Sequence, residues 1–211
     1  MAIKPILFNT EMVRAILDGR KTQMRMAIKP VALGLEYEDG SPARLPPYQP
    51  EDVLWVRESF SIWQTGQIPD LRRNYLYKAD FQGDPSKVVW RPSIHMPKEA
   101  ARLFLRVTGV GVERLRDMTI KDVMCELGEC EIVTDINENS TYKKFPPKKL
   151  TSTEPIPELR SLERYGIALL MKEVWNTTIK SADRDKYGWD ANPWVWKIEF
   201  ERCEKPEEWP Q

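Results

Sequence analysis

The sequence has few of the residues that usually build metal sites, disulfide frameworks and histidine-based catalysis. It contains three cysteines, Cys125, Cys130 and Cys203, and one histidine, His95. An odd number of cysteines argues against a disulfide framework and agrees with a reducing compartment. Their spacing is not typical of zinc ligands, and His95 has no partner nearby in the sequence. We therefore expect no metal and no cofactor, and we interpret these residues as structural.

The chain also lacks an excess of charge of either sign, and it has no long apolar run. Lysine and arginine together number 32, as do aspartate and glutamate, and the pI is about 6.6. This balance excludes the general basic excess that drives indiscriminate binding to nucleic acid, so any such contact needs a local patch. No run approaches the roughly 20 apolar residues that span a bilayer, and the N-terminus lacks the apolar region of a signal peptide. We expect a cytoplasmic protein without a membrane partner.

A cluster of polar side chains follows the first predicted helix. Residues 10–18 are expected to form this helix, with Thr10 as its N-cap and Gly19 as the residue after its end. A predicted strand, 22–28, comes next. Lys21 lies at the corner between the two elements, where its flexible side chain can aim an amine into a cleft.

The predicted strand at 22–28 separates its side chains onto two faces. Met24 and Met26 fall on one face, and Gln23 and Arg25 on the other. We expect the two methionines to line a core or a pocket, because methionine fills irregular gaps.

The rest of the sequence predicts an α+β fold. Insertions are expected at 31–50 and 129–157, which are rich in proline or in lysine and polar residues, and 204–211 is expected to be a polar tail. The glycines in a long predicted strand at 104–115 favour a bend, as small closed barrels require. We expect one domain, 1–203, built on a small mixed β-barrel with flanking helices. Further strands are predicted at 3–8, 53–58, 59–63, 75–79, 88–90 and 194–200, and further helices at 98–102, 119–127 and 158–179.

The stretch Gly19-Arg20-Lys21-Thr22 resembles the Gly-x-Lys signature of the ASCH domains, relatives of the PUA domains of RNA-modifying proteins. Three further blocks are similar to recurring blocks of the phage and prophage branch of that family: 52–58, 90–97 and 192–200. The resemblance covers most of the chain outside 31–48 and 129–157. It implies a PUA-like β-barrel with a cleft, in the cytoplasm of a bacterial host if the chain is phage-encoded.

The resemblance also implies a candidate activity, because a small bacterial ASCH enzyme removes the acetyl group from N4-acetylcytidine. Its catalytic set is a lysine in the Gly-x-Lys motif, a threonine three residues later and a glutamate on a later helix. Here the lysine maps to Lys21 and the glutamate to Glu126, while Met24 stands at the threonine position and Met26 at that of an arginine. A thioether cannot attack an amide carbonyl. Thr22, or a water activated by Glu126, would have to supply the nucleophile.

Three hypotheses about function stay open at this level. The first is a binding module whose cleft holds a nucleoside or RNA, with Lys21 contacting phosphate or carbonyl groups and an aromatic ring stacking on the base. The second is an amidohydrolase that deacylates nucleosides similar to N4-acetylcytidine, with Lys21, Glu126 and Thr22 as its catalytic residues. The third is a non-enzymatic phage accessory or morphogenesis protein, with the lysine-rich stretch at 129–155 contacting a protein partner not yet identified. The expected substrate-binding residues are Arg20, Met24, Arg25, Trp55 and Glu58.

Overall fold

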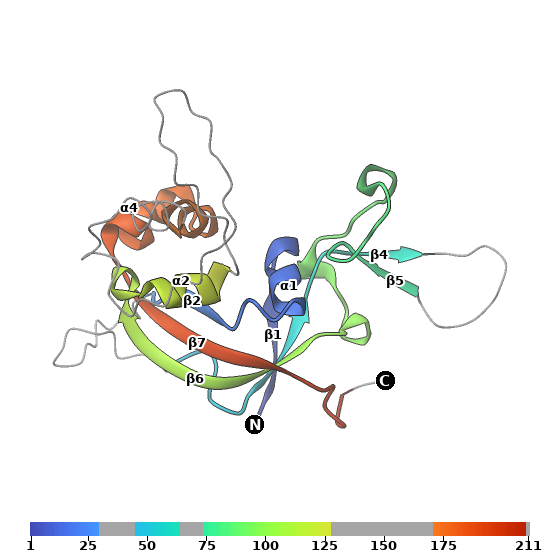
Figure 1. The fold of residues 1–211 in the computed structure, drawn as a ribbon, viewed down its shortest axis with the longest axis horizontal. Coiled ribbons are helices and arrows are strands. Elements are labelled where there is room, and N and C mark those ends of the chain that lie inside the picture. Colours follow the sequence, from blue (N-terminus) through green and yellow to red (C-terminus); the bar gives the residue numbers. More distant parts are fainter. Residues whose placement is uncertain (30–44, 64–73, 128–170, 210–211) are drawn as a thin grey trace. The chain divides into compact units, whose positions relative to one another are not determined.

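The structure is a computed structural model of the chain, and it describes residues 1–29, 45–63, 74–127 and 171–209 (Figure 1). These residues divide into two compact units, which are described separately. The first unit comprises Met1–Gly19, Gln49–Thr108 and Phe200–Gln211, and the second comprises Arg20–Tyr48 and Gly109–Glu199.

The main sheet of the described residues has five strands. Its hydrogen-bonding order is β1-β3-β6-β7-β2, and the long strands β6 and β7 contribute residues to both units. β1 pairs in parallel with β3, whereas the β3–β6 and β2–β7 pairs are antiparallel. The fold class is therefore α+β, and the described strands form an open row and not a closed barrel. The strands are β1 (Ile3–Leu7), β2 (Gln23–Ala27), β3 (Val53–Arg57), β6 (Phe104–Arg114) and β7 (Trp194–Cys203).

The first helix, α1 (Thr10–Leu17), begins at the expected residue, but its N-cap lies one residue earlier than the sequence suggested. Asn9, and not Thr10, is the N-cap, since its side-chain oxygen accepts a hydrogen bond of 2.8 Å from the Met12 amide. Gly19 follows the helix with a φ of +73°, a left-handed conformation that glycine adopts without strain. The predicted helix end is therefore confirmed.

The first unit also holds a two-stranded sheet formed by β4 (Phe60–Trp63) and β5 (Asn74–Tyr77). Its apolar face packs against buried Met96 and Ala100. The predicted strand at 88–90 is wrong. Asp84 accepts a hydrogen bond from the Ser86 amide and so opens a short 3-10 helix, which turns the chain away from an extended course before residue 88. The 3-10 helices here are η1 (Pro85–Lys87), η2 (Ser93–His95) and η3 (Lys98–Ala100), the last of them in place of the helix expected at 98–102.

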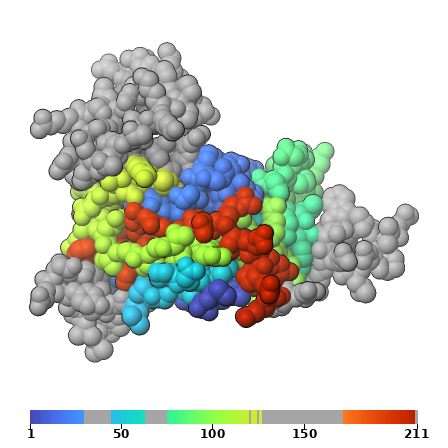
Figure 2. All heavy atoms as spheres, turned by 60° about the horizontal axis from the view of Figure 1, so that its bottom comes forward, coloured from blue at the N-terminus to red at the C-terminus, as the bar shows by residue number. Residues whose placement is uncertain are grey.

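The C-terminal segment of the first unit packs on its core, although its sequence suggested a polar tail. The Trp209 side chain is only 4% exposed, and its ring centre lies 5.4 Å from that of Trp55 and 5.2 Å from that of Phe104. Its indole nitrogen donates to the Lys98 carbonyl at 3.2 Å. Figure 2 shows this segment, in red, at the surface beside the N-terminal residues in dark blue. Trp209 thus anchors the end of the chain.

The second unit is built on the β2–β7 pair, which α2 (Ile120–Leu127) covers on one face (Figure 1). The helix predicted at 119–127 is confirmed, and it begins with a capping box. Asp122 donates its amide to the Thr119 hydroxyl at 3.1 Å, and its carboxylate accepts from the Thr119 amide at 2.9 Å. Residues 171–178 are also helical, and the remaining short elements are η4 (Leu115–Asp117), η6 (Ser181–Asp183), α4 (Arg184–Tyr187) and η7 (Trp189–Ala191).

Several sequence predictions fall outside the described residues. They concern the insertion at 129–157, most of the insertion at 31–50, and the predicted helix before residue 171. Among the helices that the structure does describe, none is long and apolar enough to cross a membrane.

Candidate functional site

The face of the β2–β7 pair that α2 covers carries two cations side by side. Arg25 of β2 lies directly opposite Lys197 of β7, and like charges at such a position destabilise a sheet. Asp122 and Glu126 are four residues apart, on one face of α2, and they compensate this repulsion. Asp122 Oδ1 lies 2.8 Å from Lys197 Nζ and 3.5 Å from Arg25 Nη2. The helix therefore binds the strands through charge complementarity.

Arg25 is the centre of this charged cluster, and its side chain is completely buried. Its Nε lies 2.6 Å from Glu113 Oε1 and its Nη1 lies 2.6 Å from Glu126 Oε2, while its main-chain amide donates to Glu126 Oε1 at 2.9 Å. Burial alone would lower the pKa of Arg25, but Glu126 and Glu113 together raise it above its ordinary value. The one group left over is Nη2, which is buried and makes no hydrogen bond within the described part of the chain.

Lys21 lies in the same cluster and is only 3% exposed. Its Nζ donates to the main-chain carbonyls of Gln23 at 2.8 Å and Glu126 at 2.5 Å. Burial lowers the pKa of Lys21 from 10.5 to about 8; Glu126 opposes this change and Arg25 adds to it. The cluster therefore contains a buried amine that can release its proton just above neutral pH.

The rim of the cluster is formed by partly exposed groups. Lys197 Nζ also lies 3.1 Å from Glu199 Oε1. Beneath the rim, the buried side-chain amide of Gln23 donates to the main-chain carbonyl of Asp122 at 2.5 Å. Burial alone would raise the pKa of Asp122, but hydrogen bonds from Lys197 and Thr119 hold it well below 3.8. Burial alone would lower the pKa of Lys197, but its bonds to the carboxylates of Asp122 and Glu199 raise it. Both partners stay charged at neutral pH.

The contact between α2 and the sheet is polar in only one part. In the other part, Val123 of α2 belongs to an apolar cluster with Val195 of β7, and Ala27 of β2 packs against it. Taking a charged pair out of water costs several kcal/mol, and replacing buried ion pairs by apolar residues is often neutral or stabilising. The contact of α2 with the sheet therefore combines an apolar part around Val123 with a charged part around Arg25.

The structure brings together three of the predicted site residues, Lys21, Arg25 and Glu126. The carboxylate of Glu126 is bound by Arg25, and the contact of Glu126 with Lys21 is made through its main-chain carbonyl. Thr22 is exposed, and its amide donates to the Cys125 carbonyl at 3.0 Å. The expected nucleophile therefore does not join the buried cluster.

Met24 and Met26 lie on the face of β2 opposite to Gln23 and Arg25. Both are half-buried, and their cross-strand neighbours are Ile198 and Trp196. The face of β2 that is most buried is therefore the polar face, whereas the sequence alone had suggested that the methionines would be the interior residues.

The other expected binding residues lie elsewhere or are already engaged. Arg20 is half-buried in the second unit. Trp55 and Glu58 belong to the first unit, where Trp55 is buried against Trp209. Both Glu58 oxygens accept hydrogen bonds from Arg102, at 2.9 and 3.0 Å, and the side chain is 1% exposed. Burial raises the pKa of Glu58 although Arg102 opposes the change. Neither residue presents a free group to a ligand in this structure.

Four members of the cluster were not among the predicted site residues: Gln23, Glu113, Asp122 and Lys197. The spacing of Asp122 and Glu126 on one helix face was a readable signal in the sequence. The pairing of Arg25 with Lys197 was not, because it depends on the register of two strands that are more than 160 residues apart in the sequence.

Cys125, Cys203 and His95, the cysteines and the histidine among the described residues, form no recognisable metal site. Cys125 and Cys203 are half-buried free thiols, and His95 is exposed. Within the described residues, no group of three or more His, Cys, Asp or Glu side chains is arranged to hold a metal ion.

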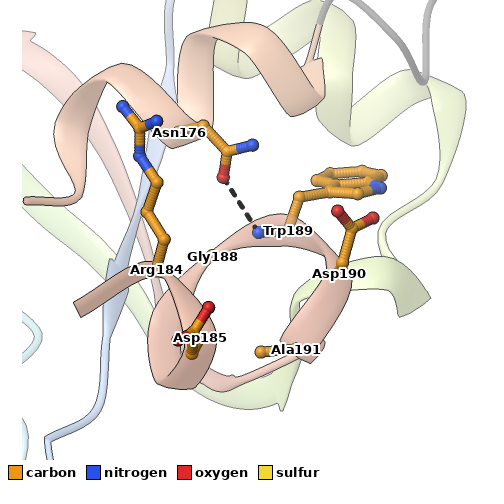
Figure 3. Close-up of a pocket in the computed structure, with 7 residues that line it drawn as sticks. All are labelled: Asn176, Arg184, Asp185, Gly188, Trp189, Asp190 and Ala191. Atoms are coloured by element: carbon orange, nitrogen blue, oxygen red, sulfur yellow. Dashed lines mark hydrogen bonds between the residues drawn. The ribbon is translucent and has the colours of Figure 1, made fainter. Parts of the chain in front are cut away.

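A shallow hollow of about 390 Å³ lies elsewhere in the second unit (Figure 3). The Asn176 side chain accepts a hydrogen bond of 3.0 Å from the Trp189 amide at its edge, and a Cβ on Gly188 would lie 2.5 Å from the Arg184 carbonyl oxygen. One guanidinium and two carboxylates line the hollow, and Lys172 pairs with one of these carboxylates, that of Asp190, at 2.9 Å, so the charges around the hollow balance. Its lining residues are Asn176, Arg184, Asp185, Gly188, Trp189, Asp190 and Ala191.

Comparison of the chain with protein-family models, with curated proteins and with solved structures finds no match in any of the three.

Proposed function

We propose that the chain is a binding module for a nucleobase, free or within RNA, and that the charged cluster around Arg25 is its recognition site. The PUA-like barrel of the ASCH family is the fold that we propose for it. The observation that carries the proposal is Arg25 Nη2, a buried cationic donor that lies 3.5 Å from Asp122 Oδ1 but makes no hydrogen bond among the described residues. Leaving such a donor unsatisfied costs about 1–3 kcal/mol or more, so an acceptor atom of a ligand would be stabilised there.

The groups around Nη2 favour a base that offers a carbonyl acceptor beside an amino donor, as cytosine does. Asp122 and Lys197 flank it with partly exposed side chains, one an acceptor and the other a donor. A base carbonyl can accept from Arg25 and Lys197, while an exocyclic amino group donates to a carboxylate of the rim. Glu113 supplies a second partly exposed carboxylate at 2.6 Å from Arg25 Nε.

Binding is favoured over hydrolysis because the cluster holds no nucleophile. The Thr22 side chain is exposed, and Met24 lies on the other face of β2. A threonine placed at position 24 would also project from that other face. We therefore expect Met24→Thr to gain no amidohydrolase activity.

Titration of the protein with cytidine, uridine and a short cytidine-rich RNA, followed by calorimetry, tests the proposal. Cytidine and the RNA should bind, and uridine, which lacks the amino group, should bind more weakly. Arg25→Lys keeps the charge but replaces the guanidinium, with its bonds to Glu113 and Glu126, by one ammonium, so its folding is checked by circular dichroism. In the folded variant the loss of Nη2 should weaken cytidine binding at least about tenfold, the effect of one charge-assisted hydrogen bond.

Arg114→Lys is the matched control, since Arg114 belongs to the same unit but stacks on Trp194 at 4.3 Å, outside the cluster. It should bind cytidine as the wild type does. The proposal fails if the wild type binds neither cytidine nor the RNA, or if Arg25→Lys binds them as tightly as the wild type.

An amidohydrolase is the second candidate, and the observation that favours it is the lowered pKa of Lys21, about 8, beside Glu126. A base poised near neutral pH is what deacylation with an activated water needs. Incubation with N4-acetylcytidine followed by chromatography separates the two candidates. Cytidine formed above the blank by the wild type, and lost in Lys21→Met, would replace binding by hydrolysis as the function. The third hypothesis, contact with a protein partner through 129–155, concerns residues outside the described part of the chain.

A further inference from the structure

The outer edge of β2 is covered by side chains and not by another strand of the described residues. In the β2–β7 pair, the Ile28 amide donates to the Trp194 carbonyl at 2.9 Å, which places these residues in a hydrogen-bonded position. Arg25 and Gln23 are an odd number of residues away from Ile28, so their main-chain groups turn away from β7. An edge with free groups of this kind is a template for pairing with another chain.

Two side chains occupy these outward groups. Glu126 Oε1 accepts from the Arg25 amide at 2.9 Å, and Lys21 Nζ donates to the Gln23 carbonyl at 2.8 Å. A carboxylate oxygen and an ammonium thus stand where the carbonyl and the amide of a neighbouring strand would stand.

Both covering groups are held in place by independent contacts. The second oxygen of Glu126 is bound by Arg25 Nη1 at 2.6 Å, and Lys21 Nζ also donates to the Glu126 carbonyl at 2.5 Å. The Thr22 amide donates to the Cys125 carbonyl at 3.0 Å. The last turn of α2 is therefore attached to the beginning of β2 by main-chain and side-chain bonds together.

We propose that Lys21 and Glu126 guard the outer edge of β2 against strand addition by a second copy of this chain. Removing either guard leaves a main-chain group of β2 unpaired, and a strand from another molecule supplies the missing partner. This role does not depend on nucleobase binding, which uses Arg25 Nη2 and can be measured separately.

Two substitutions at position 126 distinguish the loss of the hydrogen-bond acceptor from the loss of the negative charge. Glu126→Gln and Glu126→Ala both remove the carboxylate that pairs with Arg25, but glutamine keeps an oxygen that can accept from the Arg25 amide. Sedimentation velocity over a range of concentrations, with folding checked by circular dichroism, should show Glu126→Gln as monomeric as the wild type. Glu126→Ala should self-associate at least about tenfold more tightly.

A folded Glu126→Ala that stays as monomeric as the wild type overturns the proposal, and so does equal self-association of Glu126→Gln. If Glu126→Ala does not fold, Lys21→Met and Lys21→Arg give the same contrast at the Gln23 carbonyl, since arginine keeps a donor and methionine does not. Self-association of Lys21→Met, with Lys21→Arg as monomeric as the wild type, supports the proposal. The same oligomeric state in both Lys21 variants refutes it.

Discussion

Replacing Lys21 by methionine tests the electrostatics of the cluster most directly. Because burial lowers the pKa of Lys21 from 10.5 to about 8, the unfolded chain binds this proton more tightly than the folded protein does. Protonated Lys21 therefore destabilises the fold below pH 8, and the free energy of unfolding rises as the pH increases from about 8 to 10.5. The difference between the two pKa values corresponds to about 3 kcal/mol.

Two effects oppose each other in Lys21→Met at neutral pH. Methionine removes the burial penalty of about 3 kcal/mol, but it also removes two hydrogen bonds from a charged donor, which contribute about 1.5 kcal/mol or more each. The variant and the wild type should then unfold with similar free energies near pH 7. Near pH 10 the wild type should be the more stable by about 2.5 kcal/mol, since only it has gained from losing most of this proton.

Urea unfolding of both proteins between about pH 7 and pH 10 measures this difference, at a concentration where the variant is monomeric. All other lysines titrate in both proteins and cancel in the comparison. A difference in unfolding free energy that stays constant over this range would refute the assigned burial of the Lys21 charge.

Three further predictions concern stability. Trp209→Ala should lower the free energy of urea unfolding by about 3 kcal/mol, because the ring packs on two aromatic side chains. The exposed control, Glu207→Ala, should change this free energy by less than about 0.5 kcal/mol. Asp122→Asn should lose less stability in acid than the wild type does, as measured by circular dichroism. The pKa of Asp122 lies below 3.8 in the fold, so the stabilisation that its carboxylate gives, largely through Lys197, disappears as the pH falls below that value. Asn192 has a φ of +45°, so Asn192→Ala should lower the melting temperature, and Asn192→Gly should lower it less.

Local signals in the sequence were sufficient to predict most of the secondary structure. The strand at 3–8 is observed as Ile3–Leu7, and the helix at 119–127 as Ile120–Leu127 with its capping box. Such elements follow from periodicity and from hydrogen bonds between residues close in sequence. The strand at 88–90 is not observed because these residues follow a 3-10 helix and pair with no strand of the described residues, although the backbone of Val88 is extended.

The arrangement of the candidate site was less predictable, because it depends on contacts between distant segments. Alternation along β2 placed Gln23 and Arg25 on one face, but it did not show that this polar face is the more buried one. That outcome depends on Asp122 and Glu126, about 100 residues later, whose charges make the burial of a guanidinium tolerable. Trp209 was missed for a similar reason, since a lone aromatic residue among charged ones reveals no packing partner.

The proximity of Lys21 and Glu126 agrees with a catalytic pair and with a binding site, and their hydrogen bonds favour the binding site. For hydrolysis, Lys21 would have to leave two carbonyls and Glu126 would have to leave Arg25 before either could act on a water. Each charge-assisted bond contributes about 1.5–3 kcal/mol, so several such bonds would be lost before any chemistry begins. A base carbonyl that accepts from Arg25 Nη2 leaves these hydrogen bonds intact, since Nη2 makes none among the described residues, but the buried Nη2 beside Asp122 must first become accessible. In this geometry, binding therefore breaks fewer hydrogen bonds than catalysis.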